Sequence, residues 1–435
     1  MGFDRSAALL QYRRNRERSR ELFDMLPEDV YYSRPIDLRH PIVFYDGHLP
    51  GFSFNTLVKK ALGRPGIDSR LETLFARGID PHESQAAGGR SPEWPSRQTV
   101  RAFVEEADAR VIDALEHEDL VRPGDPLLDR ADAVFTILEH EAMHQETLLY
   151  MWHRLPFEQK RRPNAYVPTV DGPAPSDEWI DIPPDHVMLG VDRASVPFAW
   201  DNECPTFAVE VPAFAIERQN VTNGRFMEFV EAGGYRDPRW WTGDDWGWVQ
   251  SERIEHPLFW ERIGTPGRWF WRGMFELVPL PMAWPVYVSH AEAAAFARWR
   301  DARLPTEAEY QRAAFGDAAR LHPWGDAEPS DAYGVFDFSS WDPQPAGSHP
   351  SGASAWGVED LVGNGWEWTS TTFAPFPGFH AAASYPEYSA DFFDGEHYVM
   401  KGASPATARE LLRPTFRNWF RARYPYVYAT FRCAR

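Results

Sequence analysis

Cysteine is nearly absent from this sequence, which holds only Cys204 and Cys433 among 435 residues. Two thiols so far apart along the chain exclude a disulfide framework and favour a reducing, cytoplasmic location. Positive charge is also scarce, because 45 Lys and Arg stand against 64 Asp and Glu, for a net charge of −19. Nucleic acids and anionic membranes repel an acidic surface, so neither is expected as a partner.

Long apolar runs are missing as well. No stretch approaches the ~18 apolar residues of a membrane-spanning helix. Residues 1–26 carry charges throughout and include no apolar segment, so no signal peptide is expected. What the chain does have is 43% hydrophobic and 15% aromatic residues, with 19 Trp among them. That content suffices for packed domains and supplies aromatic surfaces on which a flat ligand can stack.

Residues 1–160 have the pattern of a helical domain. Apolar residues recur at three- and four-residue spacing in Ala7–Met25, Phe52–Ala61, Thr99–Glu118 and Asp129–Leu155. Proline-rich breaks at 90–95 and 122–126 separate the later segments. The pattern predicts a small up-and-down bundle.

The pattern changes after residue 160. Residues 161–180 are rich in proline and have no helical period, which predicts a linker. Residues 181–435 hold short apolar runs, tight turns and one clear helix at Ser289–Arg300, as in a compact mixed domain. The expected fold class is therefore α+β with two domains.

The segment ILEHEAMHQETLLYM, residues 137–151, contains H-E-x-x-H, with His140 and His144 one helical turn apart. On a helix both imidazoles can reach one cation, as in zinc peptidases. No Gly or His follows in the register that a peptidase with a third histidine requires, so we reject that function. A histidine pair at this spacing is also common on solvated or packed helix faces.

Two features favour a metal site over a packed pair. Glu139, Glu141 and Glu146 lie close by, and we expect them to accept hydrogen bonds from imidazole N–H groups. A third histidine, His48, follows Gly47 between an apolar run and the next predicted helix. It is the candidate third ligand.

Two blocks of sequence together resemble the ergothioneine-pathway sulfoxide synthases and their selenoneine-synthase branch. These enzymes join a DinB-like bundle to a domain like the formylglycine-generating enzymes, which is C-type-lectin-like. The first block is HPIVFYDGH with HEAMHQE; the second is RLPTEAEY, PWGD, DLVGNGWEWTS, YVMKGAS, RPTFRNWF and FRCAR. The resemblance covers nearly the whole chain.

Most second-block motifs also have a structural explanation. Thr306 and Glu309 in RLPTEAEY are spaced as a capping box at a helix start. In GNGWEW, glycines suit tight turns and tryptophans suit a core. We therefore expect these motifs to be scaffold, with chemistry carried elsewhere.

The resemblance implies a non-heme Fe(2+) held by His48, His140 and His144. Three imidazoles leave about three positions of an octahedral ferrous ion open for O2 and substrates. The implied reaction bonds sulfur or selenium to the imidazole C2 of hercynine (trimethylhistidine) while that atom is oxidised. The partners are thus small molecules: hercynine, a thiol or selenosugar donor, and O2.

The resemblance also suggests residues for catalysis and acceptor binding. SYPEYSADFF, residues 384–393, resembles the segment that supplies a catalytic tyrosine; Tyr385 is the first choice, with Tyr388 expected one helical turn later. Asn418 and Trp419 match an Asn-Trp pair that contacts the acceptor, and an aromatic face suits a trimethylammonium group. Met143 stands where relatives often carry Gln.

Four further positions concern the second substrate. Arg97 and Arg101 are candidates to bind a substrate carboxylate, with a surface salt bridge as the equal alternative. Relatives that use γ-glutamylcysteine resemble R-N-W-D-x-x-x-R, whereas here Phe420 replaces the Asp and Tyr424 the Arg. Aromatic walls suit a sugar face better than a zwitterion, which favours a selenosugar donor over cysteine or γ-glutamylcysteine.

Two other functions remain open at this point. The first is a formylglycine-generating oxidase, which by resemblance is a copper enzyme that uses two neighbouring cysteines. In this chain Cys204 and Cys433 are distant in sequence, and this function would not explain the helical domain. A non-catalytic binding module is the other alternative, and absence of bound metal would support it.

Overall fold

The computed structural model describes residues 3–76, 93–264, 267–316 and 320–435. The chain forms two compact units. Unit 1 comprises residues 1–165 together with the short segment Ala382–Pro386, and unit 2 comprises Tyr166–Ala381 and Glu387–Arg435. A five-residue piece of the C-terminal half therefore belongs to the helical unit. Among the described residues no helix has the length and apolar character needed to cross a membrane.

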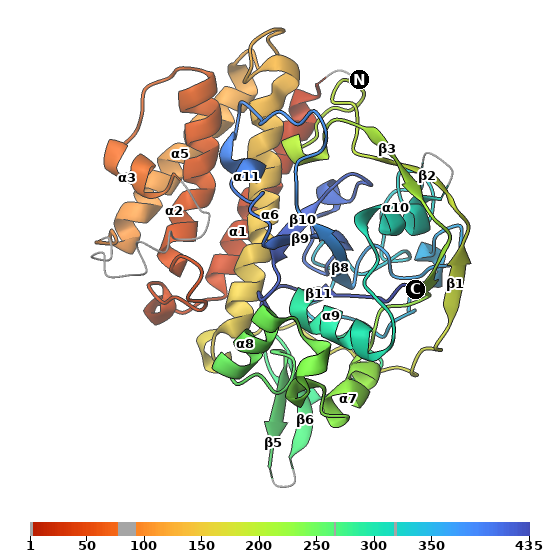
Figure 1. Cartoon of the computed structure of the whole chain (residues 1–435). Coiled ribbons are helices and arrows are strands. Elements are labelled where there is room, and N and C mark those ends of the chain that lie inside the picture. The colour runs from red at the N-terminus through yellow and green to blue at the C-terminus, as the bar shows by residue number, and fades with distance from the viewer. Residues whose placement is uncertain (1–2, 77–92, 265–266, 317–319) are drawn as a thin grey trace. The chain divides into compact units, whose positions relative to one another are not determined.

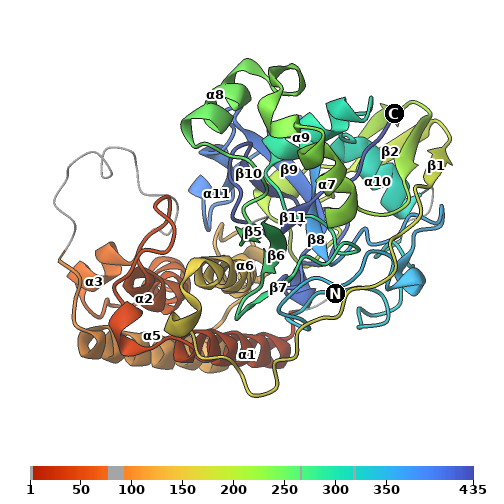
Figure 2. The same cartoon turned by 90° about the horizontal axis from the view of Figure 1, so that it is seen from below.

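Unit 1 is a bundle of α-helices (Figure 1). Its elements are α1 (Arg5–Asp24), α2 (Ile42–Ser53), α3 (Ser69–Leu74), α5 (Arg97–His117) and α6 (Asp132–Arg154), with a π-helical segment, Phe54–Ala61, continuing α2. Short 3-10 turns lie at Glu28–Val30, Asp129–Ala131 and Phe157–Gln159. The helices α1 and α5 lie side by side in Figure 2, and α1 also packs on α6.

The helix α2 differs from the sequence-based expectation, which placed His48 before a helix beginning at Phe52. In the structure α2 begins at Ile42 and includes His48. All but one of its residues are buried, so it has no polar face and no amphipathic period to reveal it. The other three helices are close to their predicted ranges. Part of the predicted break at 90–95 lies outside the described residues.

Unit 2 is a mixed unit built on a four-stranded sheet of order β10-β9-β8-β11 (Figure 1). The sheet strands are β8 (Gly365–Thr372), β9 (His397–Ala403), β10 (Asn418–Arg421) and β11 (Ala429–Thr430). The helices α9 (His290–Trp299) and α10 (Glu307–Phe315) both pack against β8. The expected α+β class with two parts is confirmed.

Smaller elements surround this sheet. They are the antiparallel pair β1 (Trp179–Ile182) with β4 (Phe214–Glu217), the pair β2 (Asp185–Leu189) with β3 (Phe207–Val211), the meander β5 (Trp260–Ile263), β6 (Arg268–Arg272), β7 (Leu277–Pro279), and the helices α7 (Asn223–Glu231), α8 (Gly243–Ser251) and α11 (Glu387–Ala390). Further 3-10 turns lie at Asp201–Glu203, Gly234–Arg236, Pro238–Trp240, Pro350–Gly352 and Arg409–Leu411. β1 begins inside the range predicted to be linker.

Two motifs have the scaffold role that the sequence predicted. Thr306 caps α10 and forms a capping box with Glu309. In GNGWEW, Gly363 has φ +102°, and a Cβ there would lie 2.7 Å from the backbone nitrogen of Val335. Trp366 and Trp368 follow on β8, both buried. Both motifs are therefore structural, one at the start of α10 and the other at the start of β8.

Candidate metal centre

Three histidines from two helices meet inside unit 1. His48 lies on α2, and His140 and His144 lie one turn apart on α6. One nitrogen from each ring lies within 4.8 Å of the others, and two of the three residues are buried. The ring centroids are 4.5–5.0 Å apart. This spacing lets three imidazoles face one cation.

The orientation of His48 is fixed by its neighbours. Its Nδ1 lies 2.7 Å from the carbonyl oxygen of Phe75, to which it donates, so its Nε2 carries the lone pair and bonds to no described residue. The ring of Phe75 packs so closely on Gly47 that a Cβ there would lie 2.5 Å from it. Gly47 thus permits the approach that brings the Phe75 carbonyl to His48. Burial lowers the pKa of His48 to about 4.

The two histidines of α6 are also held uncharged. Burial is the main cause that lowers the pKa of His140 and of His144, and the neighbouring histidines add to it. Neither nitrogen of His140 bonds to a described residue, and the same holds for Nδ1 of His144. Phe52 stacks on His140 with centroids 3.5 Å apart. Neutral imidazoles with unpartnered buried nitrogens are the donor set that a divalent transition metal requires.

Glu141, the acidic residue of H-E-x-x-H, is directed into the helix bundle. Its Oε1 accepts hydrogen bonds from Arg16 Nη1 and from Ser19 Oγ, each at 2.7 Å. Arg16 also donates to Asp108, which accepts a further bond from Tyr12. These contacts link α6 to α1 and α5, so Glu141 stabilises the bundle. The expectation that glutamates accept from the imidazoles is wrong for His140, whose nitrogens have no such partner.

Tyr385 lies beside the histidines, in the segment Ala382–Pro386 of unit 1. Its ring centroid is 6.0 Å from that of His140 and 5.1 Å from that of Phe52, and the residue is buried. The same segment is held to the bundle by Ser384, whose Oγ donates to Asp132 Oδ2 at 2.8 Å and accepts from Thr136 at 2.9 Å. Lys60 donates to the carbonyls of Ala383 and Ser384. A phenol is thus positioned close to a candidate ligand.

Tyr388 does not share a helix with Tyr385, contrary to the expectation. Pro386 follows Tyr385 and disfavours the helical conformation at the residue before it, so α11 begins only at Glu387. Tyr388 belongs to unit 2, where it stacks on Trp200 at 3.9 Å and meets Trp419 edge-on at 5.1 Å.

The remaining predicted residues of unit 2 lie on or after β10. Trp419 stacks on Phe373 with centroids 4.3 Å apart, and the side-chain oxygen of Asn418 accepts from the Trp419 N–H. Phe420 and Tyr424 stack on each other, with centroids 5.1 Å apart and planes 19° from parallel. The two residues that replace opposite charges in the motif therefore form one aromatic surface.

Arg97, Arg101 and Met143 belong to unit 1. Arg97 lies over the ring of Tyr31 at 4.9 Å and 4.0 Å from Glu28. Arg101 has an 81% exposed side chain, 3.9 Å from Glu105 on the same helix. Met143 is partly buried directly before His144. Binding of a substrate carboxylate by the two arginines stays a prediction.

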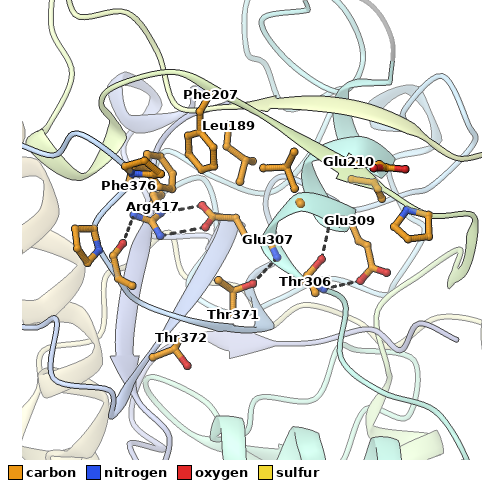
Figure 3. A pocket seen from close by; sticks show the side chains of 17 residues that line it. Leu189, Phe207, Glu210, Thr306, Glu307, Glu309, Thr371, Thr372, Phe376 and Arg417 are labelled. Carbon is orange, nitrogen blue, oxygen red and sulfur yellow. Dashed lines mark hydrogen bonds and ion pairs between the residues drawn. The ribbon is translucent and has the colours of Figure 1, made fainter.

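A pocket of about 440 Å³ in unit 2 contains none of the predicted residues (Figure 3). Its polar lining includes Glu307 and Arg417, a buried ion pair at 2.8 Å, and its apolar lining includes Phe207 and Phe376. Arg417 also donates to the carbonyls of Asn202 and Ala374. Arg417 thus makes four hydrogen bonds to protein acceptors, two of them to Glu307 on α10, which supports a structural role for the pair.

Comparison with known proteins now identifies the family. The model of the DinB superfamily matches residues 11–148, and that of the sulfatase-modifying factor enzyme 1-like domain matches residues 168–435. A hercynine oxygenase of Mycolicibacterium thermoresistibile is 36% identical over 368 residues, covering 82% of this chain and 78% of its own. This chain belongs to the hercynine oxygenase family. The prediction of an enzyme of the oxygenase type is confirmed, and so are the two domain families.

Two further relatives are similar to this chain over most of its length. The hercynine oxygenase of Mycolicibacterium smegmatis is 37% identical and covers 82% of each chain. Ergothioneine biosynthesis protein 1 of Neurospora crassa is 28% identical over 94% of this chain and 55% of its own. Because the match to the two hercynine oxygenases covers 82% of this chain, it extends into the helical domain, which a formylglycine-generating oxidase would leave unexplained.

The cysteines agree with this family assignment. Cys204 and Cys433 are both free, and Cys433 is buried. Burial raises the pKa of Cys204 to about 11 and that of Cys433 well above its usual value. No disulfide joins the two thiols, in agreement with the sequence, which offered no basis for a disulfide framework.

Proposed function

We propose that this enzyme uses a ferrous ion and O2 to bond selenium or sulfur to the imidazole C2 of hercynine. The observation that carries the proposal is the cluster of three neutral histidines, two of them buried, with the phenol of Tyr385 beside it. The relatives named for hercynine oxygenation and ergothioneine biosynthesis support the choice of acceptor.

The donor set fits iron. His48, His140 and His144 would hold the ion through imidazole nitrogens, which suit ferrous iron, and the cluster includes no thiolate or carboxylate. When bound, the ion would supply the capacity to activate O2 and to hold a heterocycle and a chalcogen donor together. Phe75 would fix the tautomer of His48, and Phe52 would keep the ring of His140 in place.

The overall reaction balances with O2 as the sole oxidant. The C2–H bond of hercynine and the Se–H or S–H bond of the donor are broken, and a C–Se or C–S bond forms. One oxygen atom ends on the chalcogen as a selenoxide or sulfoxide, and the other leaves as water with the two hydrogens. O2 therefore accepts four electrons, two for the new bond and two for oxidation of the chalcogen.

Within this reaction Tyr385 would move a proton. Its phenol would donate a proton beside the histidine cluster and take one back from the breaking C2–H bond. Tyr388 stays the alternative proton donor. Asn418 and Trp419 would bind hercynine, and Met143 would contact it without supplying the hydrogen bond of a glutamine.

For the donor we propose a selenosugar. An amino acid donor would place ammonium and carboxylate charges against the Phe420–Tyr424 surface. Burying such charges without oppositely charged or hydrogen-bonding partners costs on the order of several kcal/mol. The nearby cations are engaged: Arg423 lies 3.0 Å from Asp245, and Arg421 lies 3.7 Å from Glu396. A sugar can lay its C–H face on the aromatic surface without exposing a charge.

The second candidate is an ergothioneine sulfoxide synthase that takes cysteine or γ-glutamylcysteine. The names of the relatives favour it, since they refer to ergothioneine. The two candidates share the metal centre, the acceptor and the balance of the reaction. They differ only in the residues that meet the donor.

Oxygen uptake tests the shared chemistry. The iron-loaded enzyme should consume O2 only when hercynine and a donor are both present, with one O2 used for each hercynine lost. Equal uptake without hercynine would contradict the proposal, because the enzyme would then oxidise the donor alone. The His117→Ala variant, changed at an exposed residue of α5, serves as a control and should behave like the wild type.

A further inference from the structure

Lys60 is an exposed lysine of unit 1 that binds the chain directly before Tyr385. Its Nζ donates to the carbonyl oxygen of Ala383 at 3.0 Å and to that of Ser384 at 3.3 Å. Two consecutive backbone carbonyls therefore converge on one ammonium group. Hydrogen bonds from a charged donor are stronger than those between neutral groups, so this contact can fix the backbone that leads into Tyr385.

The local helix geometry brings Lys60 to this position. It lies in the π-helical segment Phe54–Ala61, which continues α2 and ends with a hydrogen bond from the N–H of Leu62 to the carbonyl oxygen of Leu57, five residues earlier. In a regular α-helix, a residue eight positions after Phe52 would lie about 80° past two full turns. The wider turns of a π-helix reduce that angle, so Lys60 returns toward the helix face of Phe52.

The helix face of Phe52 is the one that meets the candidate metal centre. The ring of Phe52 stacks on that of His140, and its centroid lies 5.1 Å from that of Tyr385. Helical segments of the π type are rare and occur frequently at functional sites. Here the π-helical turns bring a lysine to the chain before Tyr385, while the preceding α-helical turns place His48 in the cluster.

The other helix of the cluster also binds this segment. Ser384 Oγ donates to Asp132 Oδ2 and accepts from Thr136 Oγ1, and both of these residues lie on α6. The segment Ala382–Pro386 is thus bound by side chains from α6 and from the π-helical continuation of α2. These are the two helices that supply the candidate ligands, so the position of the segment is tied to the position of the cluster.

We infer that Lys60 is a positioning residue, which holds the phenol of Tyr385 at the histidine cluster by binding the two carbonyls before it. Its effect on turnover rests on the proposed function, whereas its hold on the segment rests on the hydrogen bonds alone. Lys60 acts through the backbone of the segment and not on the reacting atoms. Iron binding should therefore not depend on it.

Three variants test this role. Lys60→Met removes the ammonium group and keeps the length of the side chain, whereas Lys60→Arg keeps a cationic donor. Lys59→Met is the matched control, because Lys59 is the neighbouring exposed lysine of the same π-helical segment and pairs with Glu72 instead. Since the carboxylate of Glu72 is buried, this control disturbs the fold at least as much as Lys60→Met does.

Hydrogen–deuterium exchange of the full-length protein, followed in peptides that contain residues 382–386, measures the hold on the segment. In Lys60→Met the exchange there should be about 10-fold faster, because a segment with fewer contacts opens more readily. Lys60→Arg and Lys59→Met should exchange this segment at the wild-type rate. This readout needs neither iron nor turnover.

Product analysis measures the effect on the reaction, with iron-loaded enzyme, hercynine, and 1-selenoglucose or γ-glutamylcysteine. In Lys60→Met the ratio of coupled product to donor-only oxidation should fall by about 10-fold, since a misplaced catalytic group loses rate steeply with distance. Iron affinity should stay at the wild-type value, and Lys60→Arg should recover most of the ratio. In a Tyr385→Phe background Lys60→Met should not change the ratio further, because both act through one phenol.

Other outcomes would overturn the inference. Wild-type exchange and a wild-type product ratio in Lys60→Met would show that Lys60 does not position Tyr385, and the proposed function would stand. Equal losses in Lys59→Met and Lys60→Met would assign the effect to the π-helical segment as a whole. If the wild type formed no coupled product with either donor, the proposed function would fail, and faster exchange in Lys60→Met alone would still support its hold on the segment.

Discussion

The hydroxyl of Ser384 donates to the carboxylate of Asp132 at 2.8 Å, although 252 residues separate them in the chain. Asp132 begins α6, the helix that carries His140 and His144. Tyr385 follows Ser384 directly, so one hydrogen bond ties the position of the phenol to the helix of the candidate ligands. This hydrogen bond within unit 1 is central to the predictions on catalysis.

Removal of any one histidine of the cluster should abolish high-affinity iron binding. His48→Ala, His140→Ala and His144→Ala should each weaken binding by more than about 100-fold, since loss of a ligand exceeds the effect of losing a residue that only orients one. Titration with Fe(II) under anaerobic conditions measures this. Wild-type iron content in all three variants would show that the metal lies elsewhere.

Tyr385→Phe should separate metal binding from catalysis. The variant keeps the aromatic packing on Phe52 and loses only the phenolic proton, so iron and substrate affinities should stay within about 3-fold of the wild type. Formation of the C–Se or C–S bond should fall by about 100- to 10,000-fold, the range for loss of a general acid. Donor-only oxidation should then dominate the products.

Tyr388→Phe is the companion variant for this experiment. It should retain most coupled product, because its ring packs on Trp200 in unit 2. A large loss of coupling in Tyr388→Phe, with normal coupling in Tyr385→Phe, would exchange the two roles.

Ser384→Ala should reduce coupled product because it releases the segment that holds Tyr385. The expected loss is about 10- to 100-fold, the size of effect seen when a catalytic group is misplaced by about 1 Å. Iron binding should be unchanged, since Ser384 contacts no histidine of the cluster. In a Tyr385→Phe background the same substitution should have no further effect on the product ratio, because both act through one phenol. Additive losses would assign Ser384 a purely structural role.

Glu141→Ala should destabilise the helix bundle but leave the catalytic rate per bound iron nearly unchanged. Removal of one carboxylate from this buried network leaves Arg16 with Asp108 as its remaining carboxylate partner among the described residues, at a cost of up to about 3–5 kcal/mol. Thermal unfolding should therefore shift downward. Where the variant is folded and iron-loaded, its turnover per iron should stay within about 3-fold of the wild type. A loss of about 1,000-fold at full iron occupancy would instead indicate acid–base work by Glu141.

The donor preference should depend on the residues that replace charges in the family motif. With 1-selenoglucose, cysteine and γ-glutamylcysteine at equal concentration, the wild type should consume the sugar first. The double variant Phe420→Asp, Tyr424→Arg should shift preference toward γ-glutamylcysteine, since it provides partners for both charges. Preferential use of γ-glutamylcysteine by the wild type would identify an ergothioneine sulfoxide synthase.

Local patterns in the sequence predicted much of the scaffold. The amphipathic period located α1, α5 and α6 within a few residues, and the spacing of Thr306 and Glu309 predicted the capping box of α10. These features depend on contacts between residues near in sequence, which a period or a motif can encode.

Long-range packing accounts for what the sequence did not reveal. The helix α2 is buried on all sides, so its apolar run carries no helical period, although its Gly47 and Pro50 resemble turn signals. The pairing of Glu141 with Arg16 joins residues 125 positions apart. Nothing local indicates that Ala382–Pro386 belongs with the helical unit.

Mass spectrometry of the product tests the central claim most directly. Iron-loaded enzyme, hercynine, O2 and either 1-selenoglucose or γ-glutamylcysteine are incubated, and the hercynine-derived species are identified. The account predicts an adduct with the mass of both substrates minus two hydrogens plus one oxygen, and loss of the label from hercynine deuterated at C2. Full iron occupancy with hercynine recovered unchanged and its C2 deuterium retained, for every donor, would contradict it.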